Sequence, residues 1–371
     1  MHIFIITGEA SGEFNAGELV KSINSFRADI HFTAIGGTHL VNAGCKLLYP
    51  YSDINYSGFS SVVMNYSKIQ QKFKIAVNHI KESKPSAVVL VDTPGFNLRI
   101  AEEIRKFYKG RIIYYISPQL WAWHKSRVEK VRKYVDRMLV LFPFEVDFYK
   151  SEDIKADYTG HPLVAKTDEF LLANKRLDNL KPIITLLPGS RKEEIIKIMP
   201  VLNETAGKLR LRFNAEIKII RPPNIDASFY NNLIDDNSEL ISNEGDNYFS
   251  VILNSDFVIT KFGTSSLECA LLGTPFCTVY RTNFFNYHLA KSLANIKYVT
   301  MANILLDRPA IKEFIQSDFT SINLINEVSK VLTNNFYRDK ITASLKEVRA
   351  VFNSIPVTRS AAEIIIDEVT H

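Results

Sequence analysis

The chain opens on the stretch Ile3-Phe4-Ile5-Ile6-Thr7-Gly8-Glu9-Ala10-Ser11-Gly12, an apolar run that leads through a turn of small residues into a helical pattern. The same order returns near the middle of the 371-residue sequence, where Ile183-Ile184-Thr185-Leu186-Leu187 is followed by Pro188-Gly189-Ser190-Arg191. In α/β proteins, a buried parallel strand, a small-residue turn and a helix start direct backbone N–H groups at a ligand. The repetition predicts an α/β fold with two Rossmann-like, doubly wound domains that face a central cleft.

Other apolar runs of strand length alternate with helical patterns along both halves. Continuous apolar runs such as 88–91 are typical of strands covered on both faces, and the alternation with helices favours parallel sheets. After about residue 310 the pattern predicts helices only, at 321–333, 337–353 and 358–369. Strands are predicted at 2–6, 31–35, 87–91, 111–116 and 138–142, and again at 183–187, 216–220, 238–241, 256–260 and 275–279.

We expect the chain to cross between the domains in the polar stretch that begins at Gly160-His161-Pro162. The first domain would then cover residues 1–165 and the second 166–354. The last helix, within 355–371, would pack back onto the first domain. Two domains suit this length, because domains of about 100–200 residues are usual.

The composition indicates a folded protein of the cytoplasm. Hydrophobic residues make up 46% of the chain and charged residues 23%, which is ordinary for a globular protein. The three cysteines have no CxxC spacing, which argues against a disulfide framework or a zinc site. No uninterrupted apolar stretch reaches the roughly 18 residues of a membrane-spanning helix, and the N-terminus lacks the pattern of a signal peptide.

Basic and apolar residues gather in places that could contact a membrane. The net charge of +5 is concentrated in two clusters, within 68–84 and 125–137. Such clusters suit a negatively charged partner, although a solvated helix face is the plainer interpretation. Crowded apolar side chains beside lysines fit either core packing or an interfacial contact with acyl chains and membrane. The candidate membrane-facing residues are Phe59, Val62, Val63, Met64, Phe284 and Phe285.

Three turns in the second half follow predicted strands and could bind phosphate. Gly189-Ser190-Arg191 combines flexible backbone, a hydroxyl and a guanidinium that can hold phosphate through two hydrogen bonds. Gly263-Thr264 would begin a helix, and Glu268 one turn later could accept ribose hydroxyls. Tyr280-Arg281 closes the next strand. Each turn alone could be a helix cap, but several at the carboxyl ends of one sheet favour a nucleotide diphosphate.

Other nucleotide and metal motifs are missing from the sequence. No GK[ST] follows the glycines as in a Walker loop, and neither Gly8-x-x-x-Gly12 nor Gly36-Gly37 has the G-x-G-x-x-G spacing. No DxD motif or cluster of histidines and carboxylates indicates a metal. We therefore predict neither metal nor cofactor, so that Arg191 and helix N-termini would stabilise a departing diphosphate.

Asp92 follows the strand that ends at Val91 and is the candidate general base. Capping of the helix that begins near Pro94 is its other role, and the two are compatible. Glu9 in the neighbouring turn could orient a sugar hydroxyl or raise the pKa of Asp92 by like-charge proximity. The tryptophans of the loop 117–123 are more typical of packing than of ligand stacking. His161, which precedes a proline, is more typical of hinge structure than of catalysis.

Taken in order, five motifs resemble those of the lipid-A-disaccharide synthase family. The resemblance runs from residue 3 to at least Gln316, and the tryptophan motif together with the first motif makes it specific. The motifs are Gly8-Glu9-Ala10-Ser11-Gly12, Asp92-x-Pro94-x-Phe96-Asn97, Ser117-Pro118-x-x-Trp121-Ala122-Trp123, Leu187-Pro188-Gly189-Ser190-Arg191 and Gly263-Thr264-x-x-Leu267-Glu268.

The resemblance implies an inverting, metal-independent hexosyltransferase with the two-Rossmann (GT-B) fold. Such an enzyme joins UDP-2,3-diacylglucosamine to 2,3-diacylglucosamine 1-phosphate (lipid X), giving a β-1,6-linked lipid A disaccharide and UDP. It works at the cytoplasmic face of the inner membrane, peripherally bound to an anionic surface, with no nucleic acid partner. The oligomeric state stays open, with a homodimer as one form.

The resemblance also assigns roles to residues that match its motifs. Asp92 resembles the proposed catalytic base, with Glu9 and Asn97 in the acceptor site. UDP would be held by Arg191, Gly263, Thr264 and Glu268, and a donor-side stretch matches Asn303, Glu313 and Gln316. The sequence departs from the family pattern at Glu13, where aspartate is usual, at Lys261-Phe262, where small residues are common, and at Ala302, where proline is usual.

Two other functions stay open from the residues. A UDP-sugar 2-epimerase has the same architecture and needs no second sugar, but it does not explain the apolar stretches near 56–66 and 284–296. A non-catalytic, two-lobed ligand-binding protein does not explain the acid at Asp92. Incubation with a UDP-sugar alone distinguishes the epimerase, and UDP release in the presence of both lipids distinguishes the binding protein.

Overall fold

The computed structural model describes residues 1–54, 64–121, 125–223, 225–234, 238–243, 245–282 and 297–370. These residues form two compact units. The first unit combines residues 1–162 with the C-terminal segment from 355 onward, and the second spans 163–354. Within the described residues, no helix is both long and apolar enough to cross a membrane.

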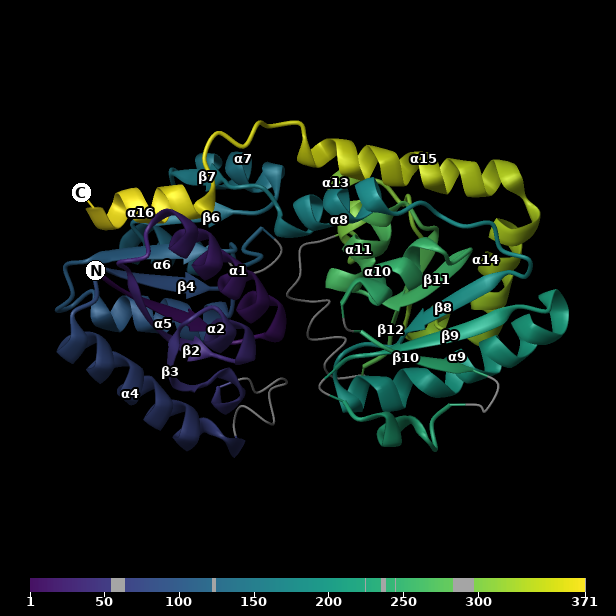
Figure 1. Cartoon of the computed structure of the whole chain (residues 1–371), viewed down its shortest axis with the longest axis horizontal. Coiled ribbons are helices and arrows are strands. Elements are labelled where there is room, and N and C mark those ends of the chain that lie inside the picture. The colour runs from purple at the N-terminus through teal and green to yellow at the C-terminus, as the bar shows by residue number, and fades with distance from the viewer. Residues whose placement is uncertain are drawn as a thin grey trace. The chain divides into compact units, whose positions relative to one another are not determined.

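The first unit is built on a parallel sheet in the order β3-β2-β1-β4-β5-β6-β7 (Figure 1). Its strands are β1 (His2–Thr7), β2 (His31–Gly36), β3 (Lys46–Pro50), β4 (Ala87–Val91), β5 (Arg111–Tyr115), β6 (Arg137–Val140) and β7 (Ala156–Tyr158). Its helices are α1 (Ala10–Phe26), α2 (Thr38–Asn42), η1 (Tyr51–Asp53), α4 (Tyr66–Ser83), α5 (Pro94–Ile104), α6 (Lys125–Tyr134), α7 (Pro143–Ser151) and α16 (Ala361–Thr370).

Alternate residues of these strands enter two separate cores, one on each face of the sheet. Phe4 and Ile6 of β1 belong to the core that α4, α5 and α6 cover. Ile3 and Ile5 belong to the core that α1, α2 and α16 cover. Helices on both faces explain why the central strands β1 and β4 are almost entirely apolar, because both of their faces are buried. The doubly wound arrangement predicted from the apolar runs is confirmed.

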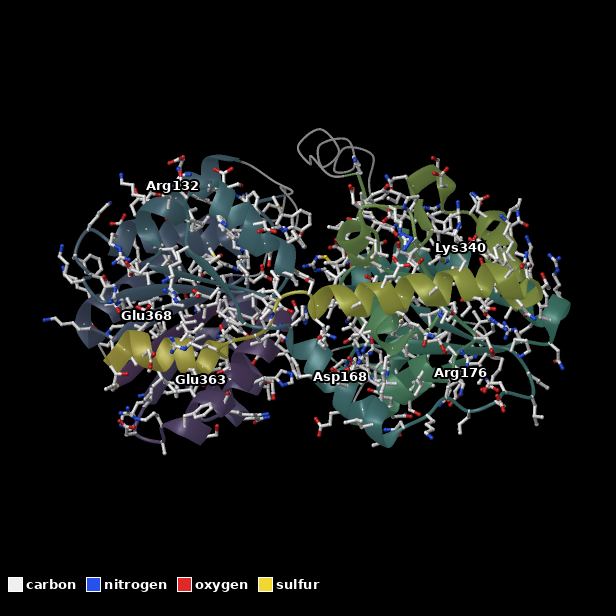
Figure 2. All side chains as sticks on the ribbon, turned by 90° about the horizontal axis from the view of Figure 1, so that it is seen from above. Arg132, Asp168, Arg176, Lys340, Glu363 and Glu368 are labelled. Carbon is white, nitrogen blue, oxygen red and sulfur yellow. The ribbon has the colours of Figure 1, made fainter. Side chains whose placement is uncertain are left out.

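The C-terminal helix α16 completes one of these two cores. Ile364 and Ile365 are buried among residues of α1 and the sheet. Glu368, further along the same helix (Figure 2), forms an ion pair with Arg111 at 3.2 Å. The end of the chain is therefore part of the same folded unit as its beginning.

The second unit has a parallel sheet in the order β10-β9-β8-β11-β12-β13. Its strands are β8 (Ile183–Leu187), β9 (Glu216–Arg221), β10 (Glu239–Ser242), β11 (Phe257–Lys261), β12 (Phe276–Tyr280) and β13 (Glu313–Ile315). Its helices are α8 (Pro162–Ala173), α9 (Lys192–Phe213), η2 (Ala227–Tyr230), α10 (Gly245–Leu253), α11 (Thr264–Leu272), α13 (Met301–Leu306), η3 (Gln316–Asp318), α14 (Ser321–Thr333) and α15 (Asn335–Phe352).

The expectation of helices alone after residue 310 is wrong, because β13 adds a strand beside β12. This strand has three residues, all partly exposed, and so has no apolar run. The strands β3 and β7 were also not predicted. β3 lies at one edge of its sheet and β7 has three residues at the other. Short or edge strands lack the continuous apolar pattern that identified the central ones.

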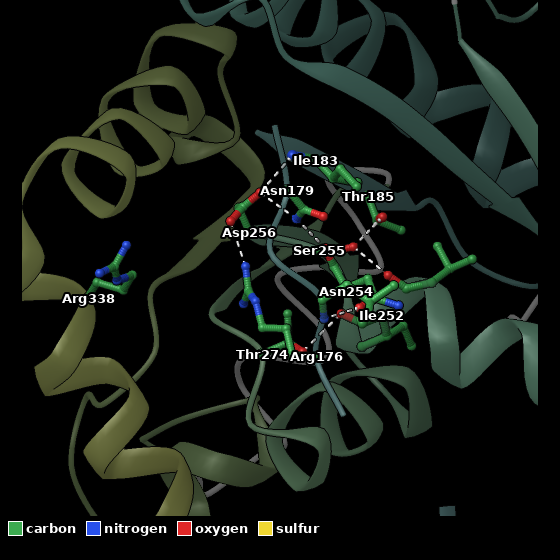
Figure 3. Close-up of polar contacts among 12 residues, drawn as sticks. Arg176, Asn179, Ile183, Thr185, Ile252, Asn254, Ser255, Asp256, Thr274 and Arg338 are labelled. Atoms are coloured by element: carbon green, nitrogen blue, oxygen red, sulfur yellow. Dashed lines mark hydrogen bonds and ion pairs between the residues drawn. The ribbon is translucent and has the colours of Figure 1, made fainter. Parts of the chain in front are cut away.

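An aspartate fixes the amino end of each sheet in the same way. In the second unit, Asp256 precedes β11 and its Oδ2 accepts the backbone N–H of Ile183, the first residue of the neighbouring β8, at 2.8 Å. Arg176 pairs with the other carboxylate oxygen at 2.5 Å (Figure 3). In the first unit, Asp136 precedes β6, accepts the N–H of Ile112 at 2.7 Å and pairs with Arg105 at 2.6 Å.

Candidate active site

The first half of the candidate site is the turn between β4 and α5. β4 ends at Val91, and Asp92 and Thr93 then adopt left-handed backbone conformations, with φ of 51° and 43°. Left-handed residues other than glycine cost roughly 1–3 kcal/mol each, so such a turn persists only where its surroundings hold it. Pro94 begins α5 immediately afterwards. The turn therefore places the Asp92 side chain at the carboxyl end of the sheet.

Hydrogen bonds to the backbone hold this turn. The Asn97 side-chain amide donates to the carbonyl oxygens of Val91 at 3.0 Å and Asp92 at 2.8 Å. The Tyr114 hydroxyl, from the adjacent strand β5, donates to the same Asp92 carbonyl. Asn97 and Tyr114 are both fully buried. Asn97, expected in the acceptor site, thus binds the backbone beneath Asp92, and its Oδ1 has no hydrogen-bond partner among the described residues.

Two glycines of the first motif lie against this turn. A Cβ on Gly8 would lie 2.4 Å from the Thr93 Oγ1, which is a severe steric clash. A Cβ on Gly12 would lie 3.5 Å from the Asp92 Cβ, which is ordinary contact. The spacing of the first motif therefore has a steric basis: the β1–α1 turn and the Asp92 turn are packed together.

The Asp92 carboxyl is suited to accept a proton near neutral pH. Burial, and then the nearby Glu9 carboxylate, raise its pKa to about 7, while the Thr93 backbone N–H opposes the rise. The N-cap residue of α5 is Thr93, not Asp92, and the Thr93 side chain makes no capping hydrogen bond. The capping role considered for Asp92 is therefore wrong, and the rise in pKa expected from Glu9 is present.

The loop after β5 packs against α7 beside this turn. The Ser117 hydroxyl bonds the Tyr149 hydroxyl at 2.8 Å, and the Trp121 ring meets Phe144 edge-on with 5.2 Å between centroids. Burial raises the pKa of Glu145 on the same helix to about 7. Packing, as the sequence favoured, accounts for Trp121, whereas Trp123 lies outside the described residues. Glu13, the departure in the first motif, is buried and accepts the Leu40 N–H of α2 at 2.8 Å.

His161 lies just before the boundary between the two units. Its ring contacts Phe142 with 5.2 Å between centroids. Burial lowers the pKa of His161 to about 4, so the imidazole is neutral at physiological pH. A neutral, packed histidine agrees with the structural role expected from the sequence.

In the second unit, the turn after β8 brings a cluster of charges together. Gly189 has a φ of 117°, and a Cβ there would lie 3.1 Å from the Lys261 side chain. Arg191 is the N-cap residue of α9 and lies 3.6 Å from Glu194, measured between guanidinium and carboxylate. Lys261 at the end of β11 pairs with the same carboxylate at 2.9 Å. The lysine that departs from the family pattern therefore balances Glu194.

The turn after β11 begins α11 with small residues. Gly263, with a φ of 136°, is the N-cap residue, and the Thr264 side chain is exposed. The Ser265 and Ser266 hydroxyls bond back to Thr260 at 2.8 Å and to the Gly263 carbonyl at 2.7 Å. These serines support the turn and leave Thr264 and the first N–H groups of the helix for a ligand.

Glu268 lies one turn further along α11. It accepts a hydrogen bond from the Tyr248 hydroxyl, and burial raises its pKa. A carboxylate held in this way is an acceptor with one oxygen already engaged. It is available to a sugar hydroxyl only through its remaining lone pairs.

The remaining residues predicted on the donor side form hydrogen bonds or packing contacts within the second unit. Arg281 donates to the Phe319 carbonyl at 2.7 Å, and the Gln316 amide bonds both the N–H and the carbonyl of Thr282, at 2.8 and 3.1 Å. Glu313 accepts the Thr300 N–H at 2.8 Å and the Asn303 amide at 2.9 Å. Tyr280 packs on Phe262. These side chains shape the backbone around the carboxyl end of β12.

Of the candidate membrane-facing residues, the structure describes Met64. Phe59, Val62, Val63, Phe284 and Phe285 lie outside the described residues. Met64 is described and is 85% exposed. In the basic stretch 125–137, several cations are paired with acids: Lys130 with Glu102, Arg132 with Glu129 and Glu152, and Arg137 with Asp157. These pairs favour the solvated-face interpretation for that stretch.

Sequence reasoning missed Tyr114 as part of the site. It sits opposite Leu90 in the parallel register of β5 with β4, one residue before the end of the strand. In the sequence it is one more apolar residue of a buried run, and only the pairing of the strands reveals its contact. Among the described residues, no group of three or more His, Cys, Asp or Glu side chains is arranged to hold a metal ion.

Solved structures with the same fold include several enzymes that act on sugars. A UDP-GlcNAc 2-epimerase from Neisseria meningitidis, bound to UDP-GlcNAc, matches with a TM-score of 0.62 over 100% of both chains at 13% identity. The calicheamicin glycosyltransferase CalG4 matches with a TM-score of 0.60, covering 100% of this chain and 98% of the other, at 12% identity. At such identities the likeness shows the fold alone, which is the GT-B arrangement of two Rossmann-like domains.

Comparisons of sequence are more specific. The family model described as lipid-A-disaccharide synthetase matches residues 3–366. "Lipid-A-disaccharide synthase 1" of Legionella pneumophila (strain Lens) is 32% identical over 99% of this chain and 97% of its own length. The "Lipid-A-disaccharide synthase" of Acidobacterium capsulatum is 32% identical over 94% of this chain and 91% of its own length. The chain therefore belongs to the lipid-A-disaccharide synthase family.

Proposed function

We propose that this chain is the hexosyltransferase that condenses UDP-2,3-diacylglucosamine with 2,3-diacylglucosamine 1-phosphate. Its products are UDP and a β-1,6-linked lipid A disaccharide 1-phosphate. Family membership across nearly the whole chain supports the reaction. The observation that carries the mechanism is the Asp92 carboxyl, presented by a strained turn with its pKa raised to about 7.

The acceptor half of the reaction uses the first unit. The 6-hydroxyl of the acceptor sugar attacks C1 of the donor sugar from the side opposite UDP, which inverts that centre. Asp92 takes the hydroxyl proton as the new bond forms. A base with a pKa near the working pH is the most effective choice, since a substantial fraction of it is deprotonated and it still binds a proton well. Glu9, which raises the pKa of Asp92, would orient a sugar hydroxyl of the acceptor.

The donor half uses the carboxyl edge of the second sheet. The leaving diphosphate is stabilised by Arg191 and by the N-terminus of α11 at Gly263 and Thr264. Helix N-termini carry unpaired N–H groups and a partial positive charge, which suit phosphate. Lys261 and Glu194 keep the surrounding charge balanced. Ser190 has an exposed side chain and can donate to the same oxygens.

The lipid substrates suggest a peripheral contact with an anionic membrane. In the described part of the first unit, α4 and the residues before it expose apolar and basic side chains together. Met64 is 85% exposed, Tyr66 55% and Ile75 37%. Lys68, Lys74 and Lys81 are exposed on the same segment. Exposed apolar side chains among lysines favour insertion at the headgroup level of an anionic bilayer.

One assay tests the function. Purified protein is incubated with both lipid precursors, and UDP and disaccharide are measured together. Equal amounts of the two products are expected. Incubation with UDP-GlcNAc alone, followed by analysis of the sugar, tests the epimerase alternative. Binding of both lipids without release of UDP would contradict the proposal and favour a ligand-binding protein.

A further inference from the structure

The Asp92 carbonyl oxygen is the point at which the first unit holds its strained turn. Asp92 and Thr93 are consecutive left-handed residues, and neither is a glycine. The turn also lies close against Gly8, since a Cβ on that glycine would be 2.4 Å from the Thr93 Oγ1. Without restraint, such a backbone relaxes towards the right-handed region, which side chains other than glycine prefer.

Two donors from different elements converge on that carbonyl. The Asn97 amide comes from α5, the helix that the turn begins, and also donates to the Val91 carbonyl at the end of β4. The Tyr114 hydroxyl comes from β5 in the middle of the sheet, which is anchored independently of the turn. The tyrosine therefore ties the turn to the neighbouring strand β5, which neither the turn nor α5 contains.

The Tyr114 hydroxyl is separable from the packing of its ring. The side chain is fully buried, so the ring fills a core position next to β4. A phenylalanine would fill the same position and would lack only the donor to Asp92. The hydroxyl therefore restrains the turn without being needed to fill the core.

We propose that Tyr114 is a positioning residue for the transfer reaction: its hydroxyl holds the Asp92 carbonyl and thereby fixes the direction of the Asp92 carboxyl. The inference rests on the proposed function, in which Asp92 accepts the proton of the acceptor hydroxyl. Loss of the hydroxyl allows the Asp92–Thr93 peptide to rotate. A catalytic group displaced by about 1 Å can lose up to about 100-fold in rate, and a partial displacement gives about tenfold.

The test compares Tyr114→Phe with Tyr108→Phe. Tyr108 is a matched control, because it is also buried in the first unit and its hydroxyl also donates to a backbone carbonyl, that of Pro85, at 2.8 Å. That bond lies at the amino end of β4, away from Asp92. Both variants lose one buried hydrogen bond, but only one of them loses the restraint on the turn.

Tyr114→Phe is expected to lower kcat about tenfold with unchanged KM for both lipids and unchanged UDP affinity. The acidic midpoint of its pH–rate profile should move to lower pH, because a looser turn admits water to the carboxyl and reverses part of the effect of burial. Tyr108→Phe should keep the wild-type kcat and midpoint, whatever its melting temperature. A Tyr114→Phe enzyme with wild-type kcat and midpoint would overturn the assignment, as would an equal loss in Tyr108→Phe.

A readout without turnover separates this inference from the proposed function. The Asp92 carboxyl is titrated by NMR in protein labelled with ¹³C at aspartate, and its signal is assigned from the Asp92→Asn variant. A downward shift of its midpoint in Tyr114→Phe alone supports positioning even if the wild-type protein makes no disaccharide, which would refute only the function. An unshifted titration overturns the positioning role.

Discussion

Thr93 occupies the space that a side chain on Gly8 would need. A Cβ there would lie 2.4 Å from Oγ1, 2.6 Å from Cγ2 and 2.8 Å from Cβ of the threonine. Threonine is branched at Cβ and sits here on a left-handed backbone, so it cannot move aside by rotation alone. At the scale of single residues, the two neighbouring turns of the first unit determine each other's shape.

We expect Gly8→Ala to displace Thr93 and with it the Asp92 carboxyl. Turnover should fall by about 100-fold, and the free energy of unfolding by about 1–3 kcal/mol from overpacking. Gly12→Ala is the matched control, since its Cβ would meet Asp92 at an ordinary 3.5 Å and alanine favours the helix. Steady-state kinetics and urea unfolding of both variants are the measurement. Similar turnover in the two would contradict the steric account.

Asp92→Asn should leave a folded protein that binds UDP but turns over about 10²–10⁴-fold more slowly. In the wild type, kcat/KM should fall as the pH drops through about 7, because the base becomes protonated and can no longer accept a proton. Initial rates between pH 5 and 9 test both statements. Near-native turnover of the asparagine variant would show that another group accepts the proton.

The same substitution should stabilise the protein at alkaline pH. Because the folded-state pKa of Asp92 lies above its ordinary value of 3.8, the folded protein binds this proton more tightly than the unfolded chain does. This contribution to stability is complete below about pH 4 and is lost as the pH rises through about 7. Melting curves of Asp92→Asn and wild type should therefore diverge at pH 8, with the variant melting higher, and converge at low pH.

The sequence predicted Asp92 and Glu9 in neighbouring turns, because each lies in the turn after an apolar run and both runs end at the same edge of a parallel sheet. It could not predict how the turn is held. The Asp92 carbonyl accepts hydrogen bonds from Asn97, in the first turns of a helix, and from Tyr114, inside a strand. Nothing in the sequence around either residue indicates this contact. Which backbone atom such side chains reach depends on the register between strands.

At the scale of elements, an aspartate before a central strand does the same work in both units. Asp256 binds the first N–H of β8, the Arg176 guanidinium and the Asn179 amide, and thus ties the segment before β8 to the sheet (Figure 3). Asp136 does this for β5 through Ile112 and Arg105. Parallel strands have no hairpin to align them, so contacts of this kind help to set their register.

We expect Asp256→Ala to lower the free energy of unfolding of the second unit by about 1–3 kcal/mol, because a strand N–H and a guanidinium lose their partner. Amide hydrogen exchange at β8 should become faster. Asp339→Ala is the control: that carboxylate is 75% exposed and lies 4.0 Å from Arg338, so its loss should change stability by less than about 0.5 kcal/mol. Unchanged exchange at β8 in Asp256→Ala would contradict the role.

Element prediction from the sequence worked where burial was complete. The strands β1, β4 and β8, covered on both faces, have continuous apolar runs and were located to within one residue. β13 was missed because its three residues are all partly exposed. It is identified as a strand only by its hydrogen bonds to β12. Pairing is a tertiary contact, and no local pattern of residues encodes it.

At the scale of the molecule, the first unit is made of two pieces of chain separated by the whole of the second. Residues 355 onward return to it after the second unit is complete. α15, the last long helix of the second unit, is tied to α8 by the ion pair of Arg349 with Asp168 (Figure 2). Each unit therefore ends in a helix of its own, α15 in the second and α16 in the first. A substitution in one of these helices should change the stability of its own unit only.

Ile365→Ala should destabilise the first unit by about 2–5 kcal/mol, since the side chain is completely buried on the face that α1 covers. Both tryptophans of the chain, Trp121 and Trp123, belong to the first unit, so their fluorescence reports its unfolding. UDP affinity, assigned to the second unit, should not change. Asp367→Ala, exposed on the same helix, is the control; an unshifted fluorescence transition in Ile365→Ala would contradict the account.

The placement of α16 has a consequence for the order in which the protein is made. A ribosome makes residues 361–370 only after the whole of the second unit, yet these residues complete one core of the first unit. Until then Ile113 and Tyr115 of β5, the strand that α16 contacts, lack part of their cover, although the second unit already has all of its sequence. The unit whose translation begins first is therefore the unit that is completed last, and a nascent chain stalled before residue 361 would expose part of the apolar core of that unit.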